Sequence, residues 1–212
     1  MVDKYQPDQN NINHLDKEAT RLGMGGNLSP EVDENLYKKR MQKRKEIQLE
    51  RVKERNLEKG LVIVFTGNGK GKTTAALGMG LRTLGHGYKV AIIQFIKGAW
   101  TTGEKKAFEK FSNNIEWKSL GAGFTWETQN RNKDQFLVNK AWEAAKEFIK
   151  DESYKLVILD EINIAIKLGY INTEEIILFL KELNMKKNLC HVILTGRGAS
   201  KEIIEFADLV TE

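Results

Sequence analysis

The sequence predicts an α/β protein in which a mostly parallel sheet of about six strands carries helices on both faces and follows an N-terminal helical extension. Three observations support this fold class. Short apolar runs rich in β-branched residues recur along the chain, helical stretches separate them, and a glycine-rich turn joins the first run to a helix. Strands that are apolar at every position are typical of a parallel sheet that is buried on both faces.

Residues 1–58 are expected to form a polar extension made of a tail and a basic helix. Residues 1 to about 30 are polar and show no sustained periodicity, so we expect no regular structure in them. Ser29 and Pro30 predict the start of a helix that spans residues 31–58. Its apolar positions are sparse. The helix is therefore either a solvated charged helix or one that docks on a partner subunit or covers a ligand.

Residues 59–212 are expected to form the α/β domain. Strands are predicted at residues 61–65, 90–95, 156–159 and 192–194, with weaker candidates at 115–120 and 209–211. Helices are predicted between them at residues 73–84, 103–112, 133–150, 173–183 and 200–206. Ligands of such sheets bind outside the carboxyl ends of the strands, so the residues that follow each strand are the candidates for function.

The composition indicates in which compartment the protein is expected and which kinds of partner it is expected to lack. The net charge is +5, but ten Lys or Arg and four Glu fall between Lys38 and Lys59, which leaves the rest of the chain near −1. Because the basic character is local, we expect no nucleic-acid partner. The single cysteine, Cys190, excludes an internal disulfide and is expected to be a buried, inert thiol, and the three scattered histidines form no metal cluster. No apolar run is long enough for a membrane span and no signal peptide is evident, so we expect a cytoplasmic protein without a membrane partner.

The stretch VIVFTGNGKGKTTAALG predicts a phosphate-binding loop between the first strand and the next helix. Glycines allow successive N–H groups to approach anionic oxygens, and the helix adds its positive end. Lys72 supplies a point charge to phosphate, Thr73 a hydroxyl ligand for Mg²⁺, and Lys70 a second cation. The usual loop has four residues between its glycines, whereas Gly67 and Gly71 enclose three. Either Thr66 takes the place of a glycine or the loop is tighter. The predicted nucleotide contacts in the loop are Gly67, Asn68, Gly69, Lys70, Gly71, Lys72, Thr73 and Thr74.

Two other strand ends carry candidate ligands. In KLVILDEIN an apolar strand ends at Asp160 and Glu161, whose carboxylates can hold Mg²⁺, or Mn²⁺ in its place, directly or through water. The alternative is that these acids are solvated or cap a helix. In TGRGAS, Arg197 stands between two glycines, where it either contacts phosphate or ribose or belongs to a plain turn.

Several separated stretches resemble one family. These are LGHGYKVAIIQFIKGAWTTGE, GAGFTWETQ, DEINIAIKLGYI and TGRGASKEIIEFADLVTE, in addition to GNGKGKTT. Together they closely resemble the bacterial ATP:corrinoid adenosyltransferases of the CobA type over about residues 38–212. The resemblance implies a P-loop NTPase fold of the RecA-like kind. Family members commonly continue beyond the last strand with a basic segment, whereas the sequence given ends at Glu212.

The resemblance also implies a reaction. In this family, Co(I) of a corrinoid attacks the 5′ carbon of ATP and the whole triphosphate leaves, with ATP bound in the opposite sense along the loop. A tighter loop would suit that altered register. Lys72, Lys70 and the loop N–H groups are then expected to hold the departing triphosphate more strongly in the transition state. A reduced metal has no proton to lose, so no general base is needed.

Further residues are assigned through the same resemblance. Phe124 and Trp126, in GFTWE, match the aromatic pair that lies against the lower face of the corrin ring and excludes the lower axial ligand; without the family, core packing would be the preferred interpretation. Gln94, Lys97 and Trp100, in QFIKGAW at the end of the second strand, are expected to contact either corrinoid or nucleotide. A homodimer, with the N-terminal segment lying over the corrinoid of the other subunit, and a flavoprotein reductase as electron donor are expected partners.

Two other functions remain open from the residues alone. A P-loop nucleotide kinase or ATPase would use the same loop and acids. A nucleotide-switched binding protein would use the basic helix on a nucleic acid or a membrane. The nature of the phosphate product separates these hypotheses.

Overall fold

The computed structural model describes residues 34–54, 58–96, 102–111, 113–121, 130–185 and 189–212. Contacts divide the chain into two units, Met1–Leu57 and Glu58–Glu212, and each is described by itself. Among the described residues, no helix has the length and apolar character needed to cross a membrane.

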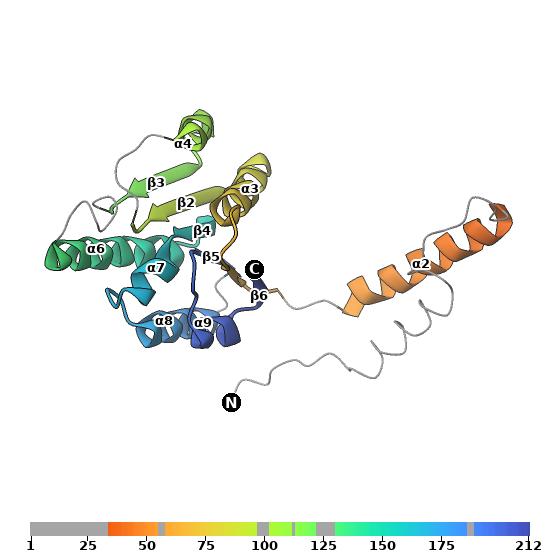
Figure 1. Ribbon diagram of the computed structural model, residues 1–212. Helices are drawn as coiled ribbons and strands as arrows, with labels where there is room; N and C mark the ends of the chain where they lie inside the picture. The colour runs from red at the N-terminus through yellow and green to blue at the C-terminus, as the bar shows by residue number, and fades with distance from the viewer. Residues whose placement is uncertain (1–33, 55–57, 97–101, 112, 122–129, 186–188) are drawn as a thin grey trace. The chain divides into compact units, whose positions relative to one another are not determined.

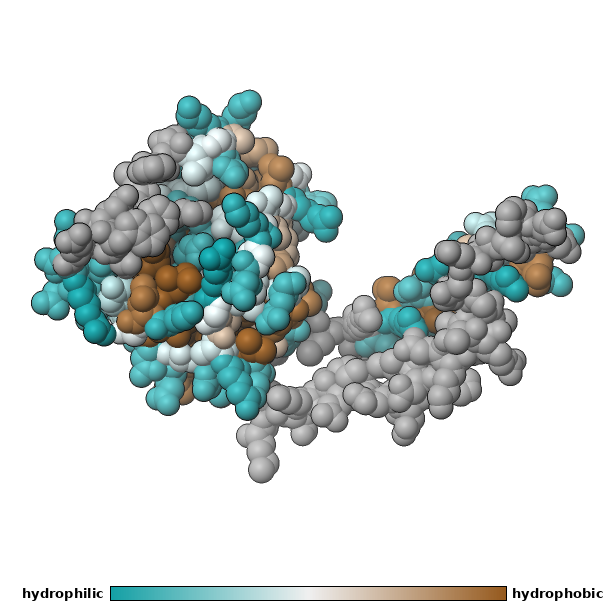
Figure 2. All heavy atoms as spheres, viewed as in Figure 1, coloured by the Kyte–Doolittle hydropathy of each residue, from teal (hydrophilic) through white to brown (hydrophobic). Residues whose placement is uncertain are grey.

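The first unit contains helix α2 (Glu34–Glu54), shown in orange in Figure 1. Its surface is largely hydrophilic with separate apolar side chains, and Ile47 is the one buried side chain among its described positions (Figure 2). Lys38 forms an ion pair with Glu34 one turn away, at 3.0 Å. The predicted helix is confirmed over these residues, but Glu58, expected to be its last residue, is not helical.

The second unit is built on a six-stranded sheet in which every pairing is parallel, in the order β3-β2-β4-β5-β1-β6. The expected fold class is therefore confirmed. The strands are β1 (Val62–Phe65), β2 (Lys89–Gln94), β3 (Ile115–Ser119), β4 (Tyr154–Asp160), β5 (His191–Thr195) and β6 (Leu209–Thr211).

Helices cover both faces of this sheet (Figure 1). Polar residues fix several of their first turns: the side chains of Thr102, Asn130 and Ser200 accept hydrogen bonds from the N–H groups three residues later. Helix α7 was not predicted from the sequence. The helices of this unit are α3 (Lys72–Gly85), α4 (Gly103–Phe108) with a following 3₁₀ turn (Glu109–Phe111), α6 (Arg131–Lys150), α7 (Ile162–Lys167), α8 (Thr173–Met185) and α9 (Lys201–Phe206).

The core consists of two apolar layers, one on each face. In β4, Leu156 and Ile158 face the layer that contains the buried side of α3 and Phe108 of α4. The alternate residues Val157 and Leu159 face the layer formed with α6, α7, α8 and α9. Because each face needs apolar side chains, the strands are apolar at successive positions, as the sequence pattern predicted. The carboxyl ends of the strands are thereby held at one edge.

The start of β5 lies beside the start of β1. Cys190 is buried, as expected, and burial raises the pKa of its thiol to about 12, which disfavours the reactive thiolate. The next residue, His191, accepts a hydrogen bond at Nδ1 from the backbone N–H of Leu61, at 3.1 Å. Burial, and then repulsion by Lys155, lowers the pKa of His191 below its ordinary value. The fold thus favours the neutral imidazole.

Stability should fall at mildly acidic pH because of His191. The unfolded chain protonates this residue near pH 6.5, whereas the folded chain resists protonation, so the free energy of unfolding decreases as pH falls through about 6.5 towards the lower folded pKa. Urea midpoints at pH 7.5 and pH 5.5 measure this decrease. His191→Asn keeps an acceptor for the Leu61 N–H without titrating, and it should reduce the difference between the two midpoints. An unchanged difference would show that other groups cause it.

Candidate active site

The loop between β1 and α3 has the backbone geometry of an anion site. Gly67 (φ 85°) and Gly71 (φ 104°) lie in the left-handed region, which side chains disfavour. Gly71 is also the N-cap residue of α3 and, as a glycine, has no side chain to accept hydrogen bonds from the first N–H groups of the helix. The N–H groups of the first turn therefore face outward from the positive end of a 14-residue helix. Such an end favours phosphate oxygens.

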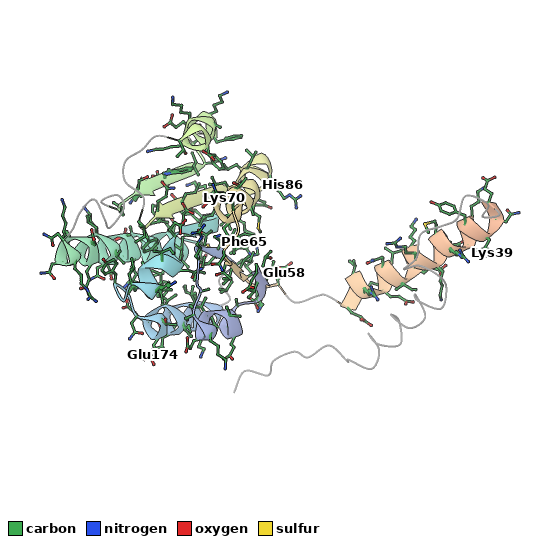
Figure 3. The ribbon with its side chains drawn as sticks, in the orientation of Figure 1. Lys39, Glu58, Phe65, Lys70, His86 and Glu174 are labelled. Atoms are coloured by element: carbon green, nitrogen blue, oxygen red, sulfur yellow. The ribbon has the colours of Figure 1, made fainter. Side chains whose placement is uncertain are left out.

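Lys72 places its charge over this loop. Its ammonium donates to the carbonyl oxygen of Gly67 at 2.9 Å and to that of Gly69. Lys70 lies in the same loop before α3 and is exposed (Figure 3). The structure thus brings both cations to the loop at the start of α3, and their contact with phosphate stays a prediction.

Thr66 explains why the loop is one residue shorter than usual. It stands where the usual loop has its first glycine, it is only 4% exposed, and its backbone φ is not positive. Its N–H donates to Thr211 at 2.9 Å, and its hydroxyl accepts from the N–H of Ala199 at 3.1 Å. The turn therefore begins at Gly67, and the position before it needs a side chain that holds a neighbouring loop.

That neighbouring loop carries Arg197, whose side chain is exposed. It lies between Gly196 (φ 126°) and Gly198 (φ 68°), so backbone conformations that favour glycine flank the arginine on both sides. The side-chain amide of Asn163 donates to the Gly196 carbonyl at 3.2 Å. Together with the bond to Thr66, this contact places the Arg197 loop beside the phosphate loop.

Asp160 lies at the centre of the site. It is 1% exposed, and its Oδ1 accepts hydrogen bonds from the hydroxyls of Thr73 and Thr195, both at 2.8 Å. The structure thus brings together Thr73 and Asp160, two of the three predicted metal ligands, although they are 87 residues apart in sequence.

Glu161, the third predicted ligand, occupies a different environment. Its backbone has φ 63°, in the left-handed region, and its N–H donates to the Thr195 hydroxyl at 2.9 Å. Its Oε2 lies 3.2 Å from the position that a Cβ on Gly196 would occupy, so the side chain packs against that glycine. Left-handed backbone at a residue other than glycine costs roughly 1–2 kcal/mol and is typical of functional sites.

The oxygen ligands fit a divalent cation that arrives with a nucleotide. Mg²⁺ prefers oxygen and is commonly held by one or two carboxylates together with substrate phosphates. Within the described ranges, no group of three or more His, Cys, Asp or Glu side chains could hold a metal ion alone. Thr73 and Asp160 therefore suit an ion whose remaining ligands come from phosphate and water.

Sequence reasoning missed two functional contacts. Thr195 bonds Asp160 through its hydroxyl, and Gln94, whose role was left open, donates its amide to Asp160 Oδ2 at 2.9 Å. The sequence signal that could have found them is that each is a polar residue at the end of an apolar strand, KVAIIQ and HVILT. The predicted Phe124 and Trp126, as well as Lys97 and Trp100, lie outside the described residues.

Comparison with known proteins identifies the family. A family model described as ATP:corrinoid adenosyltransferase BtuR/CobO/CobP matches residues 58–212. The chain belongs to this family. The resemblance seen in the sequence motifs is thus confirmed. Relatives named corrinoid adenosyltransferase align with most of the chain.

Two relatives illustrate the similarity. A corrinoid adenosyltransferase from Sinorhizobium sp. is 48% identical over 190 residues, covering 89% of this chain and 88% of the relative. The corrinoid adenosyltransferase CobA of Salmonella typhimurium is 40% identical over 181 residues, covering 85% and 90%. Among solved structures, the flagellar accessory protein FlaH from Methanocaldococcus jannaschii is 16% identical with a TM-score of 0.48, covering 77% of this chain and 75% of that one.

Gly71→Ala should weaken ATP binding about tenfold, because a side chain at φ 104° costs roughly 1–2 kcal/mol and the loop must shift to relieve it. Gly69→Ala is the matched control, since a Cβ there meets nothing within 4 Å and its φ lies outside the left-handed region. It should change affinity by less than about twofold. Titration calorimetry with ATP measures both. Equal losses in the two variants would contradict the conformational explanation.

Proposed function

We propose that this protein transfers the 5′-deoxyadenosyl group of ATP to the Co(I) centre of a corrinoid and releases triphosphate, in the biosynthesis or salvage of adenosylcobalamin. The electron pair of Co(I) forms the cobalt–carbon bond to C5′, and the bond from C5′ to the triphosphate oxygen breaks. The electrons of that bond leave with the triphosphate, and cobalt becomes formally Co(III). The observation that carries the proposal is the phosphate loop beside the Thr73–Asp160 pair in a chain of this family.

The proposed work of the site is to hold the leaving group. Negative charge grows on the triphosphate as the carbon–oxygen bond breaks, so contacts that strengthen at that stage lower the barrier. Lys72 and the N–H groups at the start of α3 support this role, because they gather positive charge at one loop. We propose that Lys70 and Arg197 add further contacts to the phosphates. Positioning, rather than proton transfer, is then the main contribution of the protein.

A divalent cation would complete this site. We propose Mg²⁺, or Mn²⁺ in its place, held by Thr73 and Asp160, with Glu161 as a further ligand. When bound with ATP, the ion would neutralise charge on the phosphates. The hydroxyl and carboxylate oxygens of the Thr73–Asp160 pair support this assignment.

The corrinoid is proposed to lie against Phe124 and Trp126. Apolar rings beneath the cobalt would exclude its lower axial ligand and make reduction to Co(I) easier. We further propose that residues 59–212 form the catalytic domain and that residues 1–58, which include α2, cover the corrinoid of the other subunit in a homodimer. A flavoprotein reductase is proposed to supply the electrons. The protein is proposed to act in the cytoplasm. The exposed, basic surface of α2 supports a docking role for that helix.

The identity of the phosphate product tests the reaction. Incubation with ATP, Mg²⁺ and a chemically reduced corrinoid should yield intact triphosphate and a cobalt–carbon bond, with little ADP when corrinoid is withheld. Lys72→Ala should lower the rate by about 10²–10³-fold, because the leaving triphosphate loses its point charge. Phosphate chromatography and the corrinoid absorption spectrum measure the two products. Steady ADP release without corrinoid would instead support a nucleotide kinase or ATPase.

Replacing the aromatic pair should separate reduction from transfer. Phe124→Ala combined with Trp126→Ala should leave the rate with preformed Co(I) within about threefold, and should lower by at least about tenfold the rate when five-coordinate Co(II) must be reduced on the enzyme. The two assays use the same ATP and metal concentrations, so nucleotide binding is controlled. Equal losses in both assays would overturn the proposed contact with the lower face.

A further inference from the structure

Gln94 is a buried amide at the carboxyl end of β2, between β3 and β4. Its side chain makes contacts in two directions. Nε2 donates to Asp160 Oδ2 at 2.9 Å, and Oε1 accepts from the indole N–H of Trp117 at 3.1 Å and from the hydroxyl of Ser119 at 2.8 Å. Gln94 is 5% exposed; its contact with Asp160 is buried, and those with Trp117 and Ser119 are partly buried. The amide therefore links β3 to the acid of the candidate active site.

The orientation of this amide is determined chemically. The oxygen and nitrogen of a glutamine are distinguished by their partners, and an indole N–H can only donate. The atom facing Trp117 must therefore be Oε1, which leaves the NH₂ group facing Asp160. A flipped amide would place two donors together at Trp117 and two acceptors together at Asp160. Both ends of the contact thus favour one arrangement.

The donor itself is held by packing. The Trp117 ring makes an edge-to-face contact with Phe108 of α4, with centroids 5.7 Å apart and planes at 70°. Phe108 is buried in the layer that also contains α3. The indole thus has a fixed position from which to orient Gln94.

We propose that Gln94 is a positioning residue for the metal–nucleotide site: by bonding Oδ2, it sets the rotation of the Asp160 carboxylate so that Oδ1 faces the Thr73 hydroxyl. This inference rests on the proposed function, in which Thr73 and Asp160 hold a divalent cation bound to ATP. In this role Gln94 acts through Asp160 and is not itself a ligand of the ion. Groups that orient a metal ligand commonly change metal affinity by 10–100-fold when they are replaced.

Two substitutions of Gln94 test this role. Gln94→Leu removes both contacts at similar volume. Gln94→Glu keeps an acceptor for Trp117 and Ser119 but turns an acceptor towards Asp160. Binding of ATP is measured by calorimetry with Mn²⁺ and again in EDTA, and bound Mn²⁺ is counted by its paramagnetic resonance signal. Both variants should weaken binding of Mn²⁺–ATP at least about tenfold and leave binding of metal-free ATP within about twofold.

Trp117→Phe and Ser119→Ala provide a second test that leaves Gln94 in place. Either donor alone can hold Oε1, so each single variant should weaken Mn²⁺–ATP binding by less than about threefold. The double variant removes both of these donors, so Oε1 is no longer held, and it should lose more than the product of the two single effects, approaching Gln94→Leu. Thermal unfolding of every variant identifies any that is not folded at the assay temperature.

The outcomes separate this inference from the proposed function. Asp160→Asn is the reference variant. If the parent protein binds ATP equally with and without Mn²⁺ and Asp160→Asn changes nothing, the metal site itself is wrong, and this proposal is overturned with it. If the parent and Asp160→Asn differ but the folded Gln94 variants bind Mn²⁺–ATP as the parent does, or lose Mn²⁺–ATP and metal-free ATP equally, only the positioning role is overturned.

Discussion

The site depends on one buried carboxylate. Moving a charged group away from water is costly unless hydrogen bonds replace its hydration, and Asp160 is almost fully buried. Its oxygens accept bonds from a hydroxyl at the start of α3, a hydroxyl at the end of β5 and an amide at the end of β2. Each bond replaces part of the lost hydration. Each hydrogen bond also fixes the position of α3, β2 or β5 relative to the end of β4. Burying Asp160 is therefore tolerated only when these elements are aligned at the same edge of the sheet.

Much of this arrangement could be predicted from the sequence, because its causes are local. Continuous apolar runs such as LVIL in β4 indicated a sheet covered on both faces, and the glycines of GNGKGKTT indicated an anion loop at the end of the first strand. Parallel strands bring their carboxyl ends to one edge, so the meeting of Thr73 with Asp160 followed from the fold class. The short helix α7 was missed because β-branched isoleucines at alternate positions of INIAIK favour a strand, and because no side chain caps its first turn as one does in α4 and α9.

Contacts that depend on tertiary packing were beyond the sequence pattern. The amide of Gln94 faces Asp160 because Trp117 occupies its other side, and that arrangement requires the register between β2 and β3. The role of Thr66 likewise depends on the position of Ala199, which is 133 residues away in the chain. The left-handed backbone of Glu161 is unusual for its residue type, so no propensity would have assigned it.

The sheet order has a consequence for the timing of synthesis. β1 lies between β5 and β6, so the first strand to leave the ribosome pairs only with the last two among the described strands. Its partner in β5 is 130 residues later, from Val62 to Val192. Closing so long a segment delays pairing, and an unpaired apolar strand is prone to aggregate. The nucleotide loop attached to β1 can therefore gain its β5 neighbour only after β5 has been translated, which leaves the first strand of the sheet waiting longest for its partner.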